Sequence, residues 1–159
     1  MLTEAQRAAA WEEWLSSEMR ASYFAELCGS YNARQRWSNF ATLILTSGAA
    51  AGIVAARMPT WVPAVMTLGA ATISAYLLVS QNIKQAMECA DLAFRWNKLA
   101  SQYRDIWNDT EADDASTKLA RADEASAEAS KAGAAFSYSK RRMSKWYDLV
   151  VANRIPRVV

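Results

Sequence analysis

The uncharged runs of this chain constrain its fold more than any other feature. Residues 37–56 contain no Asp, Glu, Lys or Arg, Arg57 interrupts, and residues 58–83 are again uncharged up to Lys84. An α-helix rises about 1.5 Å per residue and needs about 20 residues to cross a hydrocarbon core of about 30 Å. Both runs meet that length. The sequence therefore predicts two successive transmembrane helices, at about 37–56 and 60–83.

The segment between the two runs suits a tight helical hairpin. Residues 57–63 contain Pro59 and Pro63, and proline ends one helix yet is tolerated in the first turn of the next. Trp61 lies in this connection and Trp37 lies at the opposite end of the first run, which is typical of rings at two membrane interfaces. The alternative is a pair of buried helices in a water-soluble bundle, since five polar residues dilute the first run: Ser38, Asn39, Thr42, Thr46 and Ser47.

The distribution of basic residues predicts the orientation of this hairpin. An even number of spans places both termini on one side, and only Arg57 lies near the tip. By the positive-inside rule, both termini are expected in the cytoplasm and Trp61 outside. The basic residues that flank the base of the hairpin are Arg34, Arg36, Lys84, Arg95 and Lys98.

The remaining segments predict an all-α membrane protein in which cytoplasmic helices form a bundle beside the hairpin. Residues 1–36 read as an amphipathic helix that begins at a capping box, Thr3-Glu4-Ala5-Gln6, with a break expected at Gly29. The second span is expected to continue directly into a helix over 81–107. In the cytoplasmic region 84–159, a loop follows near 108–117, then an alanine-rich helix with a break near Gly133. The apolar stripe expected on the 81–107 helix is Ile83, Met87, Ala90, Phe94, Leu99, Tyr103 and Ile106.

Several classes of function are disfavoured by the composition. The chain has no histidine, and its two cysteines, Cys28 and Cys89, form no CxxC pair, which removes most catalytic triads and zinc sites. No Walker, GxGxxG or GxSxG motif occurs. The net charge of +2 gives no reason to expect binding of duplex nucleic acid. We therefore expect no enzyme, no metal and no cofactor. The acidic residues Glu111, Asp113 and Asp114 are most simply a polar loop before a helix, and a carboxylate-only active site is the alternative.

Small residues in both runs form faces on which helices can pack. Gly48 and Gly52 make a GxxxG element in the first run, and Ala71 and Ala75 lie on one face of the second. Because hydrophobicity does not drive association inside a lipid bilayer, close approach of backbones at small residues becomes important there. The pattern is equally compatible with packing inside one hairpin and with packing between copies of the chain.

A polar stripe in the two runs is a candidate pore lining. Its residues recur at spacings of three and four in the first run, and Thr67, Ser74 and Gln81 lie on one side of the second run. A ring of hairpins could present these hydroxyl and amide groups to a water-filled path. Alternatively, the hydroxyls bond the carbonyl four residues back in their own helix. The candidates are Asn39, Thr42, Thr46, Ala49, Ile53, Thr67 and Ser74.

The strongest basic patch is close to the C-terminus. Lys140, Arg141, Arg142 and Lys145 lie within six residues, beside aromatic side chains. Such a patch could bind an anionic lipid headgroup or a phosphate-bearing ligand, because guanidinium and ammonium groups bond phosphate strongly. The alternative is a solvated helix face.

The architecture, together with residues 86–103 (AMECADLAFRWNKLASQY), resembles the SLATT domain. SLATT proteins are two-transmembrane effectors found beside nucleotidyltransferases in bacterial anti-phage systems. The resemblance covers most of the chain; one departure is the absence of the histidine that many relatives carry shortly before the tryptophan. It implies a homo-oligomeric pore or ion channel, a tetramer or larger ring, in the bacterial inner membrane. It also implies abortive infection, with gating by a nucleotide or oligonucleotide that a partner nucleotidyltransferase makes.

A membrane-anchored scaffold is the competing hypothesis from the residues. In that case the hairpin only tethers the chain to membrane lipid, and the cytoplasmic helices recruit a partner. A scaffold would tolerate any equally apolar hairpin, whereas a pore would not.

Overall fold

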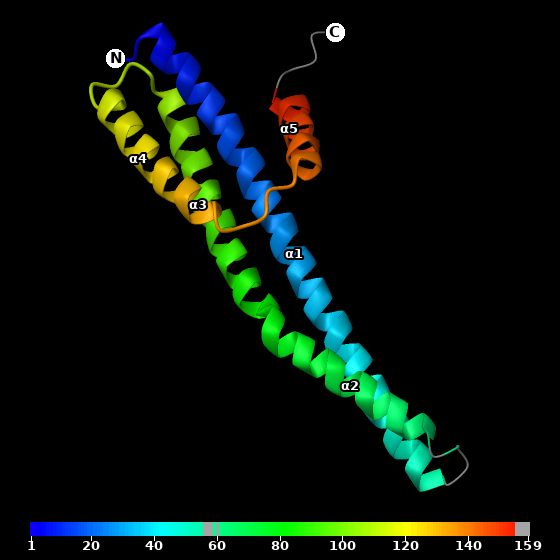
Figure 1. Cartoon of the computed structure of the whole chain (residues 1–159). Coiled ribbons are helices and arrows are strands. Elements are labelled where there is room, and N and C mark those ends of the chain that lie inside the picture. Colours follow the sequence, from blue (N-terminus) through cyan, green and yellow to red (C-terminus); the bar gives the residue numbers. More distant parts are fainter. Residues whose placement is uncertain (56–58, 60, 155–159) are drawn as a thin grey trace. The chain divides into compact units, whose positions relative to one another are not determined.

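The computed structural model of the chain describes residues 1–55, 59 and 61–154, and the side chains of all of these except 49–55. This described part holds five α-helices and no strand: α1 Glu4–Ala55, α2 Trp61–Ser80, α3 Asn82–Asn108, α4 Ala115–Gly133 and α5 Lys140–Arg154 (Figure 1). The predicted all-α class is therefore confirmed. The predicted hairpin tip at Arg57 lies outside the described residues.

The chain divides into two compact units. The bundle unit comprises Met1–Leu27 and Glu88–Val159, and the hairpin unit comprises Cys28–Met87. Helices α1 and α3 each contribute residues to both units. The sequence placed its boundaries later in α1 and earlier in α3, at 36/37 and 83/84.

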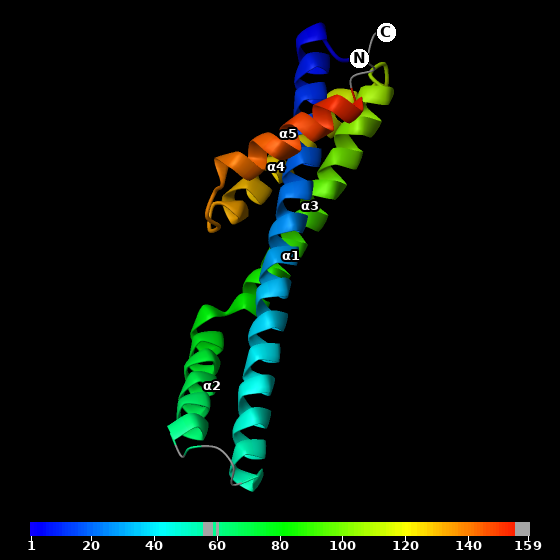
Figure 2. The ribbon, with the colours of Figure 1, turned by 90° about the vertical axis from the view of Figure 1, so that its right-hand side faces the viewer.

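In the bundle unit, the beginning of α1 lies beside α3 and α4, and α5 lies across α1 (Figures 1 and 2). The predicted capping box is confirmed: the backbone N–H of Gln6 donates to Thr3 Oγ1 at 3.2 Å, and the N–H of Thr3 donates to Gln6 Oε1 at 3.0 Å. The core is built around Trp96 and Tyr103, which are almost completely buried. The guanidinium of Arg20 covers the ring of Trp96 at 4.5 Å from its centroid.

The apolar stripe expected on α3 is wrong in its first half. Ile83, Met87 and Phe94 are exposed, and only the later residues of that stripe are buried. The residues of the buried face recur at spacings of three and four, and they include small residues that the expected stripe did not contain. It consists of Ala86, Cys89, Leu92, Trp96, Leu99, Tyr103 and Ile106. Alanine and cysteine bury little area, so a search for large apolar residues misses the register that they keep.

In the hairpin unit, the later part of α1 and helix α2 run alongside each other in opposite directions (Figure 2). Two sequence expectations fail at its ends. Gly29 does not end the first helix, since α1 continues through it to Ala55. The direct continuation of the second span into the next helix is also wrong, because Gln81 takes a φ of 46° between Ser80 and Asn82. This left-handed conformation interrupts the helical hydrogen bonding.

The other expected breaks coincide with helix ends. The polar connection near 108–117 lies between α3 and α4, and α4 ends at Gly133. Cys28 and Cys89 are free thiols.

Candidate functional site

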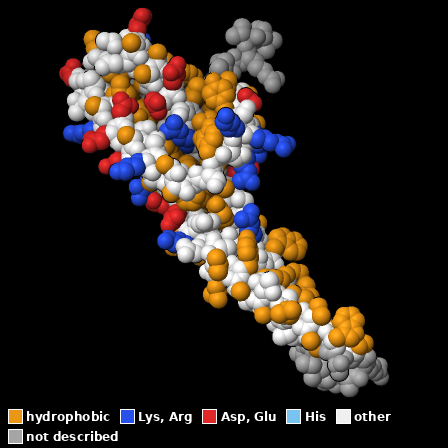
Figure 3. Space-filling model, in the orientation of Figure 1, with side chains coloured by type: hydrophobic (Ala, Val, Ile, Leu, Met, Phe, Trp, Pro, Cys, Tyr) orange, Lys and Arg blue, Asp and Glu red, His pale blue; other side chains and the backbone are white. Residues whose placement is uncertain are grey.

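The hairpin unit exposes its large apolar side chains. Leu78 and Val79 are 83% and 81% exposed, and Trp37 and Leu68 are each 70% exposed. Figure 3 shows apolar side chains gathered over the hairpin helices on the face drawn there. Soluble monomers rarely expose apolar surface in contiguous patches of this kind, and such patches mark contact with a membrane or another protein.

One stretch in the described part of the chain is long and apolar enough to cross a membrane. It lies within Trp61–Asn108, which comprises α2, Gln81 and α3, and its most apolar 18 residues are only 6% buried. A core helix of a soluble protein would be mostly buried. The exposure therefore disfavours the alternative of two buried helices in a soluble bundle.

The glycine face of α1 packs against α2 within the hairpin. A Cβ placed on Gly48 would collide with the terminal methyl of Met66, and a Cβ placed on Gly69 would lie 3.5 Å from Leu45. Ala70 of α2 is 4% exposed. Gly48 is thus occupied by contacts inside one chain, which was one of the two packing arrangements left open by the sequence.

The other predicted packing residues are not in this contact. Ala71 and Ala75 are exposed on α2, so packing of that face against a second copy stays a prediction. The side chain of Gly52 lies outside the described residues.

The hydroxyls of the polar stripe bond to their own helices. Thr42, Thr46 and Thr67 donate to the carbonyls of Ser38, Thr42 and Pro63, at 3.0, 2.9 and 2.8 Å. This is the alternative geometry that the sequence left open.

The stripe contains four further residues. Asn39 accepts a hydrogen bond from Gln35 at 3.2 Å, and Ser74 is half-buried. The side chains of Ala49 and Ile53 lie outside the described residues. The placement of the stripe around a pore stays a prediction.

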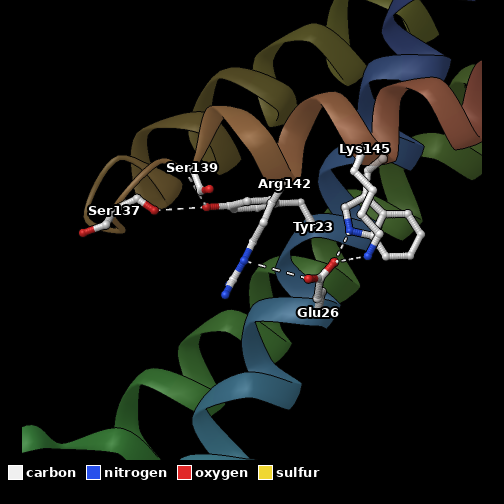
Figure 4. A network of polar contacts seen from close by, with 7 residues as sticks. Tyr23, Glu26, Ser137, Ser139, Arg142 and Lys145 are labelled. Atoms are coloured by element: carbon white, nitrogen blue, oxygen red, sulfur yellow. Dashed lines mark hydrogen bonds and ion pairs between the residues drawn. The ribbon is translucent and has the colours of Figure 1, made fainter.

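The basic cluster divides into two halves. The Lys145 ammonium lies 3.1 Å from a carboxylate oxygen of Glu26, and the Arg142 guanidinium lies 3.9 Å from the other (Figure 4). Trp146 Nε1 donates to the same carboxylate at 2.6 Å. The hydrogen bond from Lys145, helped by the one from Trp146, lowers the pKa of Glu26.

Lys140 and Arg141 are exposed and make no ion pair with any described residue. The structure therefore leaves only this half of the predicted ligand-binding cluster free for a ligand.

Residues of α1 to which the sequence analysis assigned no site role hold α5 in place. Tyr23 donates to the carbonyl of Ser137 at 3.0 Å and accepts from the N–H of Ser139 at 3.3 Å (Figure 4). The Arg154 guanidinium donates to both carboxylate oxygens of Glu18, at 3.0 and 2.5 Å. That hydrogen bonding raises the pKa of Arg154. The only signal in the sequence was that Glu18 and Glu26 lie about two turns apart on one helix. This spacing does not identify their partners on α5.

The acidic residues of the α3–α4 connection form no shared site. Asp114 pairs with Lys118 at 2.9 Å, and Glu111 and Asp113 are exposed. No group of three or more Cys, Asp or Glu side chains in the described residues could hold a metal ion.

A pocket of about 580 Å³ lies between α3 and α4 in the bundle unit. It carries Lys118 and Arg121 together with Asp105 and Asp109. Because charges of both signs line it, this pocket does not select an anionic ligand.

Comparison of the chain with protein-family models, with curated proteins and with solved structures finds no match.

Proposed function

We propose that the chain is a pore-forming or ion-channel effector of the bacterial inner membrane that acts in anti-phage defence by abortive infection. The observation that carries this proposal is the outward-facing apolar surface of the hairpin unit, with Leu68, Leu78 and Val79 among its most exposed side chains. In water this surface would be unfavourable by about 25 cal/mol per Å², and in a bilayer it is matched to its surroundings. Two spans, with both termini cytoplasmic, are part of the proposal.

The proposed pore is a ring of four or more hairpins. Gly48 is used inside the hairpin, so the exposed face with Ala71 and Ala75 is left to contact the next copy. The threonine hydroxyls donate to their own helix, yet each oxygen keeps acceptor capacity that can face a water-filled path. A lining of this kind would be polar and uncharged.

Gating is proposed to occur through the bundle unit in response to a nucleotide or oligonucleotide signal from a partner nucleotidyltransferase. Lys140 and Arg141 are the exposed cations available for its phosphates, since Arg142 and Lys145 already face Glu26. A ligand can gate the pore only if it binds the closed and open forms with different affinity.

Ionic current across a planar bilayer tests this proposal. Ala71→Leu adds bulk to the proposed contact between copies without touching the Gly48–Met66 contact, and Val65→Leu is the matched control on another exposed face of α2. We expect discrete current steps from the wild type and from Val65→Leu, and their loss in Ala71→Leu. A silent wild type, with and without candidate nucleotides, would contradict the pore.

The hydroxyl bonds favour a second candidate, a membrane-anchored helical scaffold. Because Thr42, Thr46 and Thr67 satisfy their hydroxyl protons locally, the stripe is also compatible with a hairpin that only anchors the chain. A scaffold would be harmless when overproduced and would keep its function with an unrelated apolar hairpin. Killing of cells that depends on this particular hairpin would exclude it.

A further inference from the structure

The hairpin unit carries positive charge without any acidic residue. All 16 acidic residues of the chain lie in the bundle unit, and residues 28–87 contain only four charged side chains: Arg34, Arg36, Arg57 and Lys84. Arg34 and Arg36 are exposed and make no ion pair or hydrogen bond with any described residue. Their counter-charge must therefore come from outside this unit.

Arg36 borders an apolar groove on α1. The groove, about 360 Å³, is lined by Ala33, Arg36, Trp37 and Phe40. The rings of Trp37 and Phe40 meet edge to face with centroids 5.9 Å apart, and they are 70% and 51% exposed. Residues at these spacings share one face of a helix. The groove therefore offers a cation at one end and two large apolar rings at the other.

The same exposed face continues along α1 to Ile44, which is 51% exposed. At a rise of about 1.5 Å per residue, Phe40 lies about 6 Å and Ile44 about 12 Å along the axis from Arg36. This distance matches the upper part of an acyl chain below its headgroup. A soluble phosphate compound would use the arginines and leave this apolar track empty.

We propose that this groove binds an anionic phospholipid of the cytoplasmic leaflet. The guanidinium group of Arg36 holds the phosphodiester, for which its planar donor geometry is suited. Arg34 lies two residues away on the other side of the helix and adds positive charge near the same headgroup level. The Trp37 ring lies at headgroup level, and the acyl chain follows Phe40 and Ile44. A headgroup with net negative charge is preferred, because a zwitterionic headgroup compensates its phosphate with its own ammonium. The inference depends on membrane insertion, which is part of the proposed function, but not on pore formation.

Native mass spectrometry of the full chain in detergent tests the site, with dioleoylphosphatidylglycerol and dioleoylphosphatidylcholine as the two probes. We expect the wild type to retain the phosphatidylglycerol in preference. The double change Arg34→Gln, Arg36→Gln is expected to weaken that retention about 25-fold, because each basic residue near an anionic surface contributes on the order of a factor of five. Retention of the phosphatidylcholine is expected to change little.

Two further variants make the result specific. Arg121→Gln with Lys131→Gln removes two exposed cations from the bundle unit and is expected to leave lipid retention as in the wild type. Arg36→Lys keeps the charge but loses the planar fork, so it is expected to weaken retention less than the double change. Since Arg34 and Arg36 are exposed, the helix content of these variants should stay that of the wild type.

Equal losses in the two double variants would overturn the proposal, because retention would then follow net charge and not this groove. Complete displacement of the lipid by excess inorganic phosphate would also overturn it and identify a soluble anion site. Extraction of membranes with alkaline carbonate separates this inference from the proposed function. Release of the chain would contradict membrane insertion and both proposals, whereas a retained chain that binds the lipid but carries no current would contradict the pore alone.

Discussion

The large side chains of the two units are distributed in opposite ways. In the bundle unit Trp96 and Tyr103 are 1% and 0% exposed, whereas in the hairpin unit Leu78 and Val79 are more than four-fifths exposed. Both units are rich in apolar residues, so composition alone does not distinguish them. The two units differ in whether their large apolar side chains are buried or exposed. Water favours the first arrangement and lipid tolerates the second.

Polar groups show the same contrast. In the bundle unit, side chains bond across more than 100 residues of sequence, as Glu18 does with Arg154 and Glu26 with Lys145. In the hairpin unit, the side-chain bonds of Gln35, Thr46 and Thr67 stay within one helix, at a separation of four residues. Local satisfaction suits a segment in lipid, where no water replaces a missing partner.

Matched leucine truncations should give the largest difference between the units. Leu99 of the bundle unit is 3% exposed and Leu78 of the hairpin unit is 83% exposed. Leu99→Ala should destabilise the bundle by about 2–5 kcal/mol, because it removes buried methyl groups and leaves a cavity. Leu78→Ala should stay within about 0.5 kcal/mol. Thermal unfolding in detergent, followed by near-ultraviolet circular dichroism, measures both. A large effect of Leu78→Ala would show that this residue is buried in an assembly.

Matched lysine substitutions test the solvent of each unit. Leu68 of the hairpin unit and Phe94 of the bundle unit are almost equally exposed, at 70% and 68%. Leu68→Lys should disfavour membrane insertion by about 3 kcal/mol, since lysine is costly near the centre of a membrane helix. Phe94→Lys should be nearly neutral, because this site faces water. The fraction retained in carbonate-washed membranes measures the difference. Equal retention of the two variants would contradict the assignment of the hairpin to lipid.

Local signals in the sequence predicted a large part of this structure. The break predicted near Gly133 coincides with the end of α4. The capping box at Thr3 marked the start of α1, because its hydrogen bonds join neighbouring residues only. The back-bonding of Thr46 was one of two stated possibilities, for the same reason. Contacts between adjacent helices were predicted only in part. The sequence pattern identified Gly48 as a packing residue but did not identify Met66 as its partner.

The features that the sequence did not predict depend on distant or weak signals. Gly29 has nothing within 4 Å of a Cβ placed on it, and a single exposed glycine costs a helix only about 1 kcal/mol, which the flanking turns of α1 outweigh. The sequence around the interruption at Gln81 contains no glycine or proline, which are the usual signals of a helix break. The division of the basic cluster follows from Glu26, which precedes Lys145 by 119 residues.

Glu26→Gln should loosen α5 from α1 by about 1 kcal/mol. It removes the ion pairs with Lys145 and Arg142 and weakens the hydrogen bond from Trp146, in a partly exposed setting where such pairs contribute modestly. Hydrogen exchange of the α5 amides should become roughly fivefold faster. Glu12→Gln is the control, because Glu12 is exposed on the same helix. Unchanged exchange in Glu26→Gln would show that apolar contacts alone hold α5.

The smallest expected effect is the pH dependence of the same contact. The pKa of Glu26 is lowered from its ordinary value of 4.5, chiefly by the hydrogen bond from Lys145. A lowered folded-state pKa means that the stabilisation is fully present above the ordinary value and is lost as pH falls through the lowered one. In 5-fluorotryptophan protein, the fluorine resonance of Trp146, assigned with Trp146→Phe, should titrate with a midpoint below 4.5 and should stop titrating in Glu26→Gln. Trp61 lies in the hairpin unit, which has no carboxylate side chain, so its resonance should stay constant over the same range. If both resonances moved together, acid would be unfolding the whole chain, and the two units would not differ in the way that their polar contacts indicate.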